Sequence, residues 1–341
     1  MMVDDLHAAL RDQLLPPDLA ATLTTSQLTS RNAAGTTPLH TAAKYGALNS
    51  LPPSELTSEN LLIKNDSGYT PLHHAALGGF LNQIPVSILT TGALLTRSNS
   101  GYTVFHVAAA HAHLDQLPPD LITAETVQAH TDLGNTLLHE AAENGTLDRF
   151  PKWFLNADLL GRTNASGETV FHVAAFNGNL RQLPEALLTV AAMRATTSSG
   201  DTVIHAAAIA GRLEQIPVAF LTGESLTLSS KAGYSIIHAA AESGQLDKIP
   251  PAGLSAALLL TRNDHGDTPL HAAAYEGHLD QVPPALLTPE NLGVRNYDGV
   301  TPVRIAVSRG FVSQLPASLR PKPPGAIARV LAKLGLARSS W

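Results

Sequence analysis

Histidine is the residue type of this 341-residue chain best suited to chemistry, because imidazole can bind metals and move protons near neutral pH. The sequence contains 15 histidines, and eight of them recur every 33 residues. Each of the eight stands three positions after a threonine or serine, a spacing that matches a helix-capping box with imidazole in place of the usual Glu or Gln. The eight are His40, His73, His106, His139, His172, His205, His238 and His271.

These periodic histidines are too far apart to share a metal ion. Packed helices lie about 8–10 Å apart, whereas zinc needs its nitrogen ligands at about 2.1 Å. We therefore predict that they are buried and structural. His106, His111 and His113 form one local group, at the point where Ala112 replaces a periodic glycine. This group is the remaining metal candidate, although no acidic residue stands at a ligand spacing from it.

Sequence motifs of common enzyme classes do not occur. The chain has no Gly-x-Ser-x-Gly elbow, no phosphate loop ending in Gly-Lys-Ser/Thr and no His-Glu-x-x-His zinc motif. It contains no cysteine, which excludes disulfides, thiolate nucleophiles and thiolate metal sites. A net charge of −6 gives no reason to expect nucleic-acid binding. We expect neither catalysis nor a cofactor.

The elements that must position the histidines follow from a glycine with the same period. After each such glycine come an N-capping threonine or serine, a helical stretch with paired alanines, and in eight of the nine repeats a second glycine suited to a left-handed cap. A period kept without insertions predicts stacked helical repeats that bury their apolar faces against one another. The opening glycines are Gly35, Gly68, Gly101, Gly134, Gly167, Gly200, Gly233, Gly266 and Gly299.

The motif beside these glycines resembles the ankyrin repeat. Thr-Pro-Leu-His occurs intact at 37–40, 70–73 and 268–271, and Gly-His-Leu-Asp follows at 277–280. The resemblance covers roughly residues 35–319 and indicates a bacterial-type variant whose second helix is interrupted by proline. It implies an all-α fold, an ankyrin-like α-solenoid of about nine 33-residue repeats with N- and C-terminal caps. The expected parts are a capping half-repeat (1–34), the nine repeats (35–319), and a proline-rich break with a capping helix (320–341).

The second half of each repeat departs from the family pattern, because a proline interrupts it in all nine. Proline inside a helix costs about 3 kcal/mol or more, so a continuous second helix is not expected. For the eighth repeat we predict a turn over 279–282, a short helix over 284–287 and a further turn capped by Thr288. The prolines are Pro52, Pro85, Pro118, Pro151, Pro184, Pro217, Pro250, Pro283 and Pro316.

Both ends of the chain predict amphipathic helices. The first covers 3–15, with Leu6, Leu10 and Leu14 on one side. The second covers Gly325–Ala337, with apolar Ile327, Val330, Leu331 and Leu334 on one side and basic Arg329 and Lys333 on or near the other. One interpretation of the second helix is a cap on the last repeat. The other is a basic segment that binds a membrane surface or a partner groove.

Tyrosines and a few apolar residues are the candidates for binding a partner. The resemblance implies that ankyrin repeats face their targets with the loop tips beside the first glycine and with positions late in the first helix. Tyr is enriched at interfaces because its ring adds contact area and keeps a polar tip. The alternative is that the rings pack on neighbouring loops. The candidates are Tyr45, Tyr69, Leu77, Tyr102, Phe176, Ile209, Tyr234, Tyr275 and Tyr297.

The expected function is a protein–protein interaction scaffold that binds another protein through its concave loop-and-first-helix groove. The alternative is a structural or membrane-peripheral adaptor that acts through the basic C-terminal helix. The acidic start of the chain is unlike a secretory signal, and no apolar run is long enough to span a membrane. We therefore expect a cytoplasmic monomer, and the sequence is also compatible with delivery into another cell as an effector.

Overall fold

The computed structural model describes residues 3–321, and these form an all-α array with a period of 33 residues. The predicted helix over 325–337 lies outside the described residues. The chain divides into two compact units, one ending at Ile216 and the other beginning at Pro217. Each unit is described by itself below.

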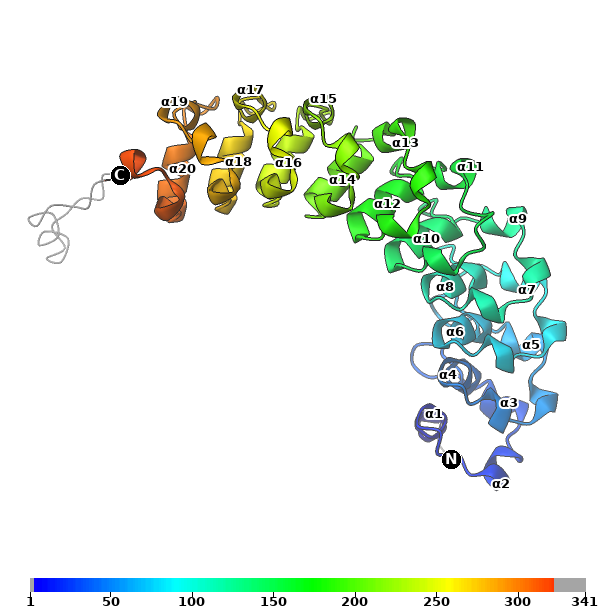
Figure 1. Cartoon of the computed structure of the whole chain (residues 1–341). Helices are drawn as coiled ribbons and strands as arrows, with labels where there is room; N and C mark the ends of the chain where they lie inside the picture. The colour runs from blue at the N-terminus through cyan, green and yellow to red at the C-terminus, as the bar shows by residue number, and fades with distance from the viewer. Residues whose placement is uncertain (1–2, 322–341) are drawn as a thin grey trace, which may run out of the picture. The chain divides into compact units, whose positions relative to one another are not determined.

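The first helix of each repeat begins directly after its capping threonine or serine. Within each unit, successive first helices pack against each other, and buried alanines such as Ala75 and Ala108 let them approach closely (Figure 1). In the first unit they are α4 (Pro38–Tyr45), α6 (Pro71–Gly78), α8 (Val104–Ala110), α10 (Leu137–Asn144), α12 (Val170–Asn177) and α14 (Val203–Ile209). In the second they are α16 (Ile236–Glu242), α18 (Pro269–Glu276) and α20 (Pro302–Arg309).

The second half of the eighth repeat has the three short segments predicted for it. Two are single turns of 3₁₀ helix, and the third is α19 (Pro289–Leu292), capped by the Thr288 side chain. The other helices of this kind are α5 (Ser58–Leu61), α7 (Thr91–Leu94), α9 (Ala124–Val127), α11 (Ala157–Leu160), α13 (Val190–Arg194), α15 (Gly223–Leu226) and α17 (Ala256–Leu259).

The 3₁₀ turns carry the leucines that close the core beneath the first helices, such as Leu81 and Leu279, which are fully buried. The first turns are Leu48–Ser50, Leu81–Gln83, Leu114–Gln116, Leu147–Arg149, Leu180–Gln182, Leu213–Gln215, Leu246–Lys248, Leu279–Gln281 and Val312–Gln314. The second turns are Pro53–Glu55, Val86–Ile88, Pro119–Leu121, Glu185–Leu187, Val218–Phe220, Pro251–Gly253, Pro284–Leu286 and Ala317–Leu319.

The N-terminal helix is shorter than the sequence predicts. Helix α1 (Val3–Arg11) buries Leu6 and Leu10 against α4 and then ends, and α2 (Pro17–Ala20) and α3 (Thr25–Leu28) follow. Gln13 takes a left-handed conformation with φ of 54°. The expected continuation to residue 15 is therefore wrong. Leu14 leaves the apolar side of the helix and is 74% exposed.

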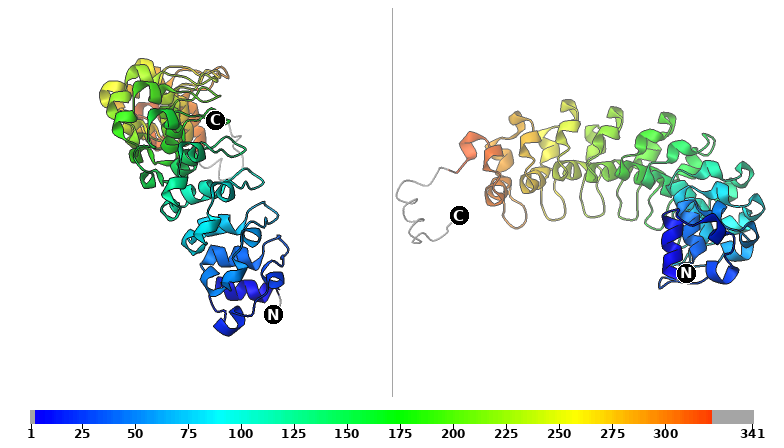
Figure 2. Two further views of the ribbon diagram at one scale, coloured as in Figure 1. Left: turned by 90° about the vertical axis from the view of Figure 1, so that its right-hand side faces the viewer. Right: turned by 90° about the horizontal axis from the view of Figure 1, so that it is seen from below.

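Hairpin loops connect successive repeats, and Figure 2 shows those of the second unit side by side. In the loop before α6, the Asn65 side chain accepts hydrogen bonds from the N–H groups of Ser67 and Tyr69. The turn needs glycine at position 68, where φ is 78° and a Cβ would lie 2.6 Å from the Asn99 nitrogen. The Asn99 N–H donates to the Ser67 carbonyl at 3.0 Å, which links neighbouring loops.

Candidate functional site

The periodic histidines form the predicted capping boxes. His73 Nδ1 accepts from the Thr70 backbone N–H at 3.1 Å and lies 2.8 Å from the Thr70 hydroxyl. The backbone donor fixes Nδ1 as an acceptor, so the ring proton is on Nε2, which donates to the Tyr102 carbonyl of the next loop at 3.1 Å. All eight histidines cap their helices in this way.

Burial keeps these imidazoles neutral. It lowers the pKa of His40, His73 and His106 to about 4, partly offset by the hydrogen bond to the next loop. With both ring nitrogens engaged, the histidines have no lone pair free for a metal or a substrate. Among residues 3–321, no three His, Cys, Asp or Glu side chains are grouped so that they could hold a metal ion.

The local histidine group is also drawn into the fold. Ala112 takes the predicted left-handed conformation, with φ of 63°. His113 Nδ1 hydrogen-bonds to the Ala76 carbonyl of the preceding repeat at 2.8 Å. His111 stacks on His113 with ring centroids 6.5 Å apart, whereas the His106 ring points to its own cap and to the Asn135 carbonyl.

The first unit brings Tyr69, Leu77 and Tyr102 together around a hollow of about 240 Å³ between α6 and α8. The Tyr69 ring meets the His73 ring edge to face, with centroids 5.2 Å apart. We name this the tyrosine–histidine hollow. It is lined by Tyr69, His73, His74, Leu77, Tyr102, Val107, Ala110 and His111. Tyr45, which we expected in the same patch, does not line it. Instead the Lys44 ammonium lies 5.4 Å from the Tyr45 ring centroid.

The rings of this hollow are half-buried, where the sequence suggested exposed ones. Burial raises the pKa of Tyr102 to about 12, and the Glu140 carboxylate, which accepts its hydrogen bond, contributes to the same shift. Burial together with the neighbouring His40 lowers the pKa of His74 to about 3. The surface is therefore aromatic and uncharged at neutral pH, apart from Glu140 beneath Tyr102.

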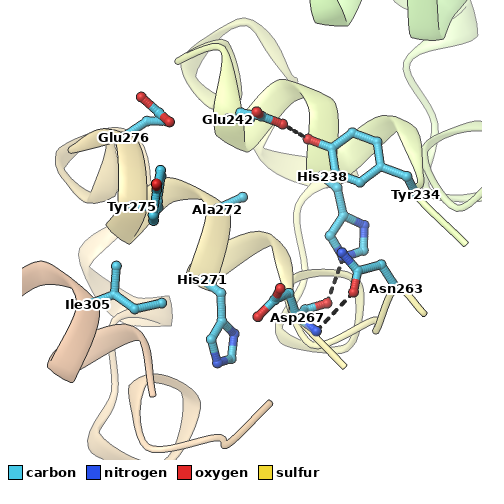
Figure 3. A pocket seen from close by; sticks show the side chains of 10 residues that line it. All are labelled: Tyr234, His238, Glu242, Asn263, Asp267, His271, Ala272, Tyr275, Glu276 and Ile305. Carbon is cyan, nitrogen blue, oxygen red and sulfur yellow. Dashed lines mark hydrogen bonds between the residues drawn. The ribbon is translucent and has the colours of Figure 1, made fainter. Parts of the chain in front are cut away.

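The second unit brings Tyr234 and Tyr275 together around a hollow of about 200 Å³, shown in Figure 3. The Tyr234 hydroxyl donates to the Glu242 carboxylate. The Arg309 guanidinium lies over the Tyr275 ring, 3.5 Å from its centroid. We name this the tyrosine–carboxylate hollow. It is lined by Tyr234, His238, Glu242, Asn263, Asp267, His271, Ala272, Tyr275, Glu276 and Ile305.

The remaining candidates divide into two kinds. Phe176 on α12 and Ile209 on α14 occupy the same position of their repeats, and their side chains are 51% and 48% exposed. Tyr297 is 72% exposed, but its ring lies against Gly266 of the preceding loop, 2.7 Å from where a Cβ would stand. Its contact is therefore the loop packing that we considered as the alternative to binding.

Sequence reasoning missed a second set of links between repeats, made by glutamines of the first 3₁₀ turn. Gln83 Oε1 accepts from the Leu48 N–H at 3.0 Å, and Gln83 Nε2 donates to the Gly46 carbonyl at 2.9 Å. The signal was a period of 33 residues in the glutamines themselves. Gln116, Gln182 and Gln314 make the same pair of bonds. The carboxylates around Tyr234 and Tyr275 were also missed.

Comparison with known proteins supports the fold. Residues 265–295, which lie in the eighth repeat, match the family model of the ankyrin repeat. Helices packed in sequence with a 33-residue period are consistent with an ankyrin solenoid, a fold typically used for protein–protein interaction. No curated protein matches the chain. None of the helices within residues 3–321 is long and apolar enough to cross a membrane.

Proposed function

We propose that the protein binds a partner protein through the surface made by the hairpin loops and the ends of the first helices. The observation that carries this proposal is the position nine residues after the hairpin glycine. It holds Leu77, Phe176, Ile209 and Tyr275, and the last three are 51%, 48% and 50% exposed. A position that faced only water would be polar, so repeated large apolar side chains support a binding role.

The rigidity of the surface supports the same function. Every first helix from α4 to α18 is tied to its own loop by a capping histidine, and most of these histidines also bond to the next loop. A preformed surface loses little conformational entropy when it binds, so more of the contact energy appears as affinity. Binding of this kind needs no catalytic group or cofactor. The alternative adaptor function rests on residues 325–337, outside the described chain.

The experiment compares groove variants with a control on the other half of the repeat. The partner is first captured from native lysate by the immobilised full chain and then purified. Phe176→Ala, Ile209→Ala and Tyr275→Ala are each titrated against it. We expect at least one of them to weaken binding by about tenfold or more, as loss of a hot-spot side chain does. Because the three side chains are half-exposed, each variant should change the unfolding free energy by only about 1 kcal/mol or less.

Val86→Ala is the matched control, because Val86 is 75% exposed but lies in a second 3₁₀ turn and not on a first helix. It should bind like the unmodified protein. If all three groove variants bind as well as Val86→Ala does, the proposed surface is not the binding surface.

A further inference from the structure

We infer that the tyrosine–carboxylate hollow receives an arginine or lysine side chain of the partner protein. The inference rests on the proposed function and adds the chemistry of one anchor. Its basis is the set of side chains that α16, α18 and the loop between them place around one small opening (Figure 3).

The charge of the hollow is negative and is not matched from within its lining. Glu242, Asp267 and Glu276 contribute carboxylates, and none of the ten lining residues is a lysine or arginine. Burial raises the pKa of the Glu242 carboxyl, and the negative charge of Glu276 raises it further. A cation between these two carboxylates would relieve their repulsion and replace lost solvation.

The helices add to this negative potential. Glu242 is the last residue of α16, and Glu276 is the last residue of α18. The C-terminal end of a helix carries partial negative charge, so cations are favoured there and carboxylates are not. Two acidic residues at neighbouring helix ends therefore oppose local helix stability, which fits a role in binding a positive group.

The aromatic rings suit the same occupant. Cations bind favourably over tyrosine faces, and Arg309 already places its guanidinium over the Tyr275 ring without lining the hollow. Ala272 and Ile305 supply apolar surface for the methylene stem that arginine and lysine carry behind the charge. The Asn296 amide donates to Asp267 at 2.7 Å and fixes that carboxylate at the edge of the hollow.

The size of the hollow favours a single side chain. Small-molecule sites usually enclose roughly 300–1,000 Å³. At about 200 Å³ this hollow is smaller. The tyrosine–histidine hollow of the first unit has a similar volume but no lysine, arginine or carboxylate in its lining, so it suits an apolar anchor. The two hollows thus differ in the chemistry they accept.

The test uses a random peptide library selected against the full-length protein. Peptides retained by the protein are titrated in two forms, with arginine or lysine and with the neutral replacements citrulline or norleucine. The same titrations are made on the double variant Glu242→Gln/Glu276→Gln. Glu185→Gln is the charge control, because Glu185 is exposed in a second 3₁₀ turn of the first unit. Unfolding curves of all variants check that they are folded.

We expect selected peptides to carry a basic residue. Neutralising that residue, or both carboxylates, should weaken binding about fivefold or more, and the two losses should not add. Glu185→Gln should have no effect. Peptides that bind at the first helices without preference for a basic residue would overturn this inference and leave the proposed function standing. A protein that retains no peptides would contradict both.

The chain's own end is the rival occupant, because residues 322–341 contain Lys322, Arg329, Lys333 and Arg338. A full-length variant with Arg329, Lys333 and Arg338 changed to glutamine addresses it. If that variant binds the basic peptides about fivefold more tightly, the tail competes for the hollow, and the assignment to a partner protein is wrong. Equal affinities support the assignment.

Discussion

Acid should unfold this protein through its capping histidines, starting well above the pH at which its carboxylates protonate. His40, His73 and His106 have folded pKa values of about 4, whereas an unfolded histidine has about 6.5. Above pH 6.5 the ring is neutral in both states, and stability is complete. Below it the unfolded chain takes up protons that the folded chain does not, so stability falls until the pH reaches the folded pKa.

The magnitude follows from this difference. At about pH 5.5 each of these histidines lowers the unfolding free energy by about 1.4 kcal/mol, since the unfolded state is one pH unit below its pKa. Three such sites together give about 4 kcal/mol, and His139, His172, His238 and His271, whose pKa values burial also lowers, add to the loss. Such a loss is a large fraction of the stability of an ordinary domain.

The physical cause is the direction of one hydrogen bond. Protonated His73 would carry hydrogens on both ring nitrogens, and its Nδ1 could no longer accept from the Thr70 N–H. The cap would be lost at the helix end while the buried ring became charged. The assay is urea unfolding followed by circular dichroism at several values from about pH 7.5 to about pH 5.5, with NMR titration of the histidine rings.

His73→Gln is the specific control, because glutamine can cap a helix from the same position but does not titrate. The variant should be less stable at pH 7.5, since it loses packing, yet its stability should depend less on pH by about 1.4 kcal/mol over the same range. A midpoint that stays constant from pH 7.5 to 5.5 would refute the reasoning. So would a His73→Gln variant with the full pH dependence.

Three further predictions concern stability and binding. Ala112→Gly should raise the unfolding free energy by about 0.5–1 kcal/mol, because the left-handed conformation with φ of 63° suits glycine; a lower urea midpoint would contradict this. Gln83→Ala should cost about 1–3 kcal/mol and speed hydrogen exchange at the Leu48 N–H, which loses its partner; unchanged exchange there would show that the glutamine links are dispensable. Tyr69→Ala and Tyr102→Ala should each weaken partner binding by about 2 kcal/mol or more and lower stability by roughly 1–2 kcal/mol, because the rings are half-buried; lower stability with unchanged binding would favour the loop-packing interpretation.

The sequence by itself determined the features that depend on neighbours along the chain. A threonine cap, an imidazole three residues later and a glycine at the helix end act within one helix, so their pattern predicted α6 and its counterparts. A proline breaks a helix wherever it stands, which was sufficient to predict the three short segments after α18. Strict repetition then carried each local inference to all nine repeats.

Only the tertiary structure decided which side chains from different repeats meet. Gln83 reaches Leu48, Tyr102 reaches Glu140, and Glu242 faces Glu276 across intervals of 34 to 38 residues. Such pairs depend on the stacking of helices, which the motif within one repeat does not specify. Leu14 shows the same limit, because the left-handed Gln13 ends α1 before the apolar pattern does. Periodicity places each residue in its own repeat, whereas burial and charge at the candidate site arise from the contacts between repeats.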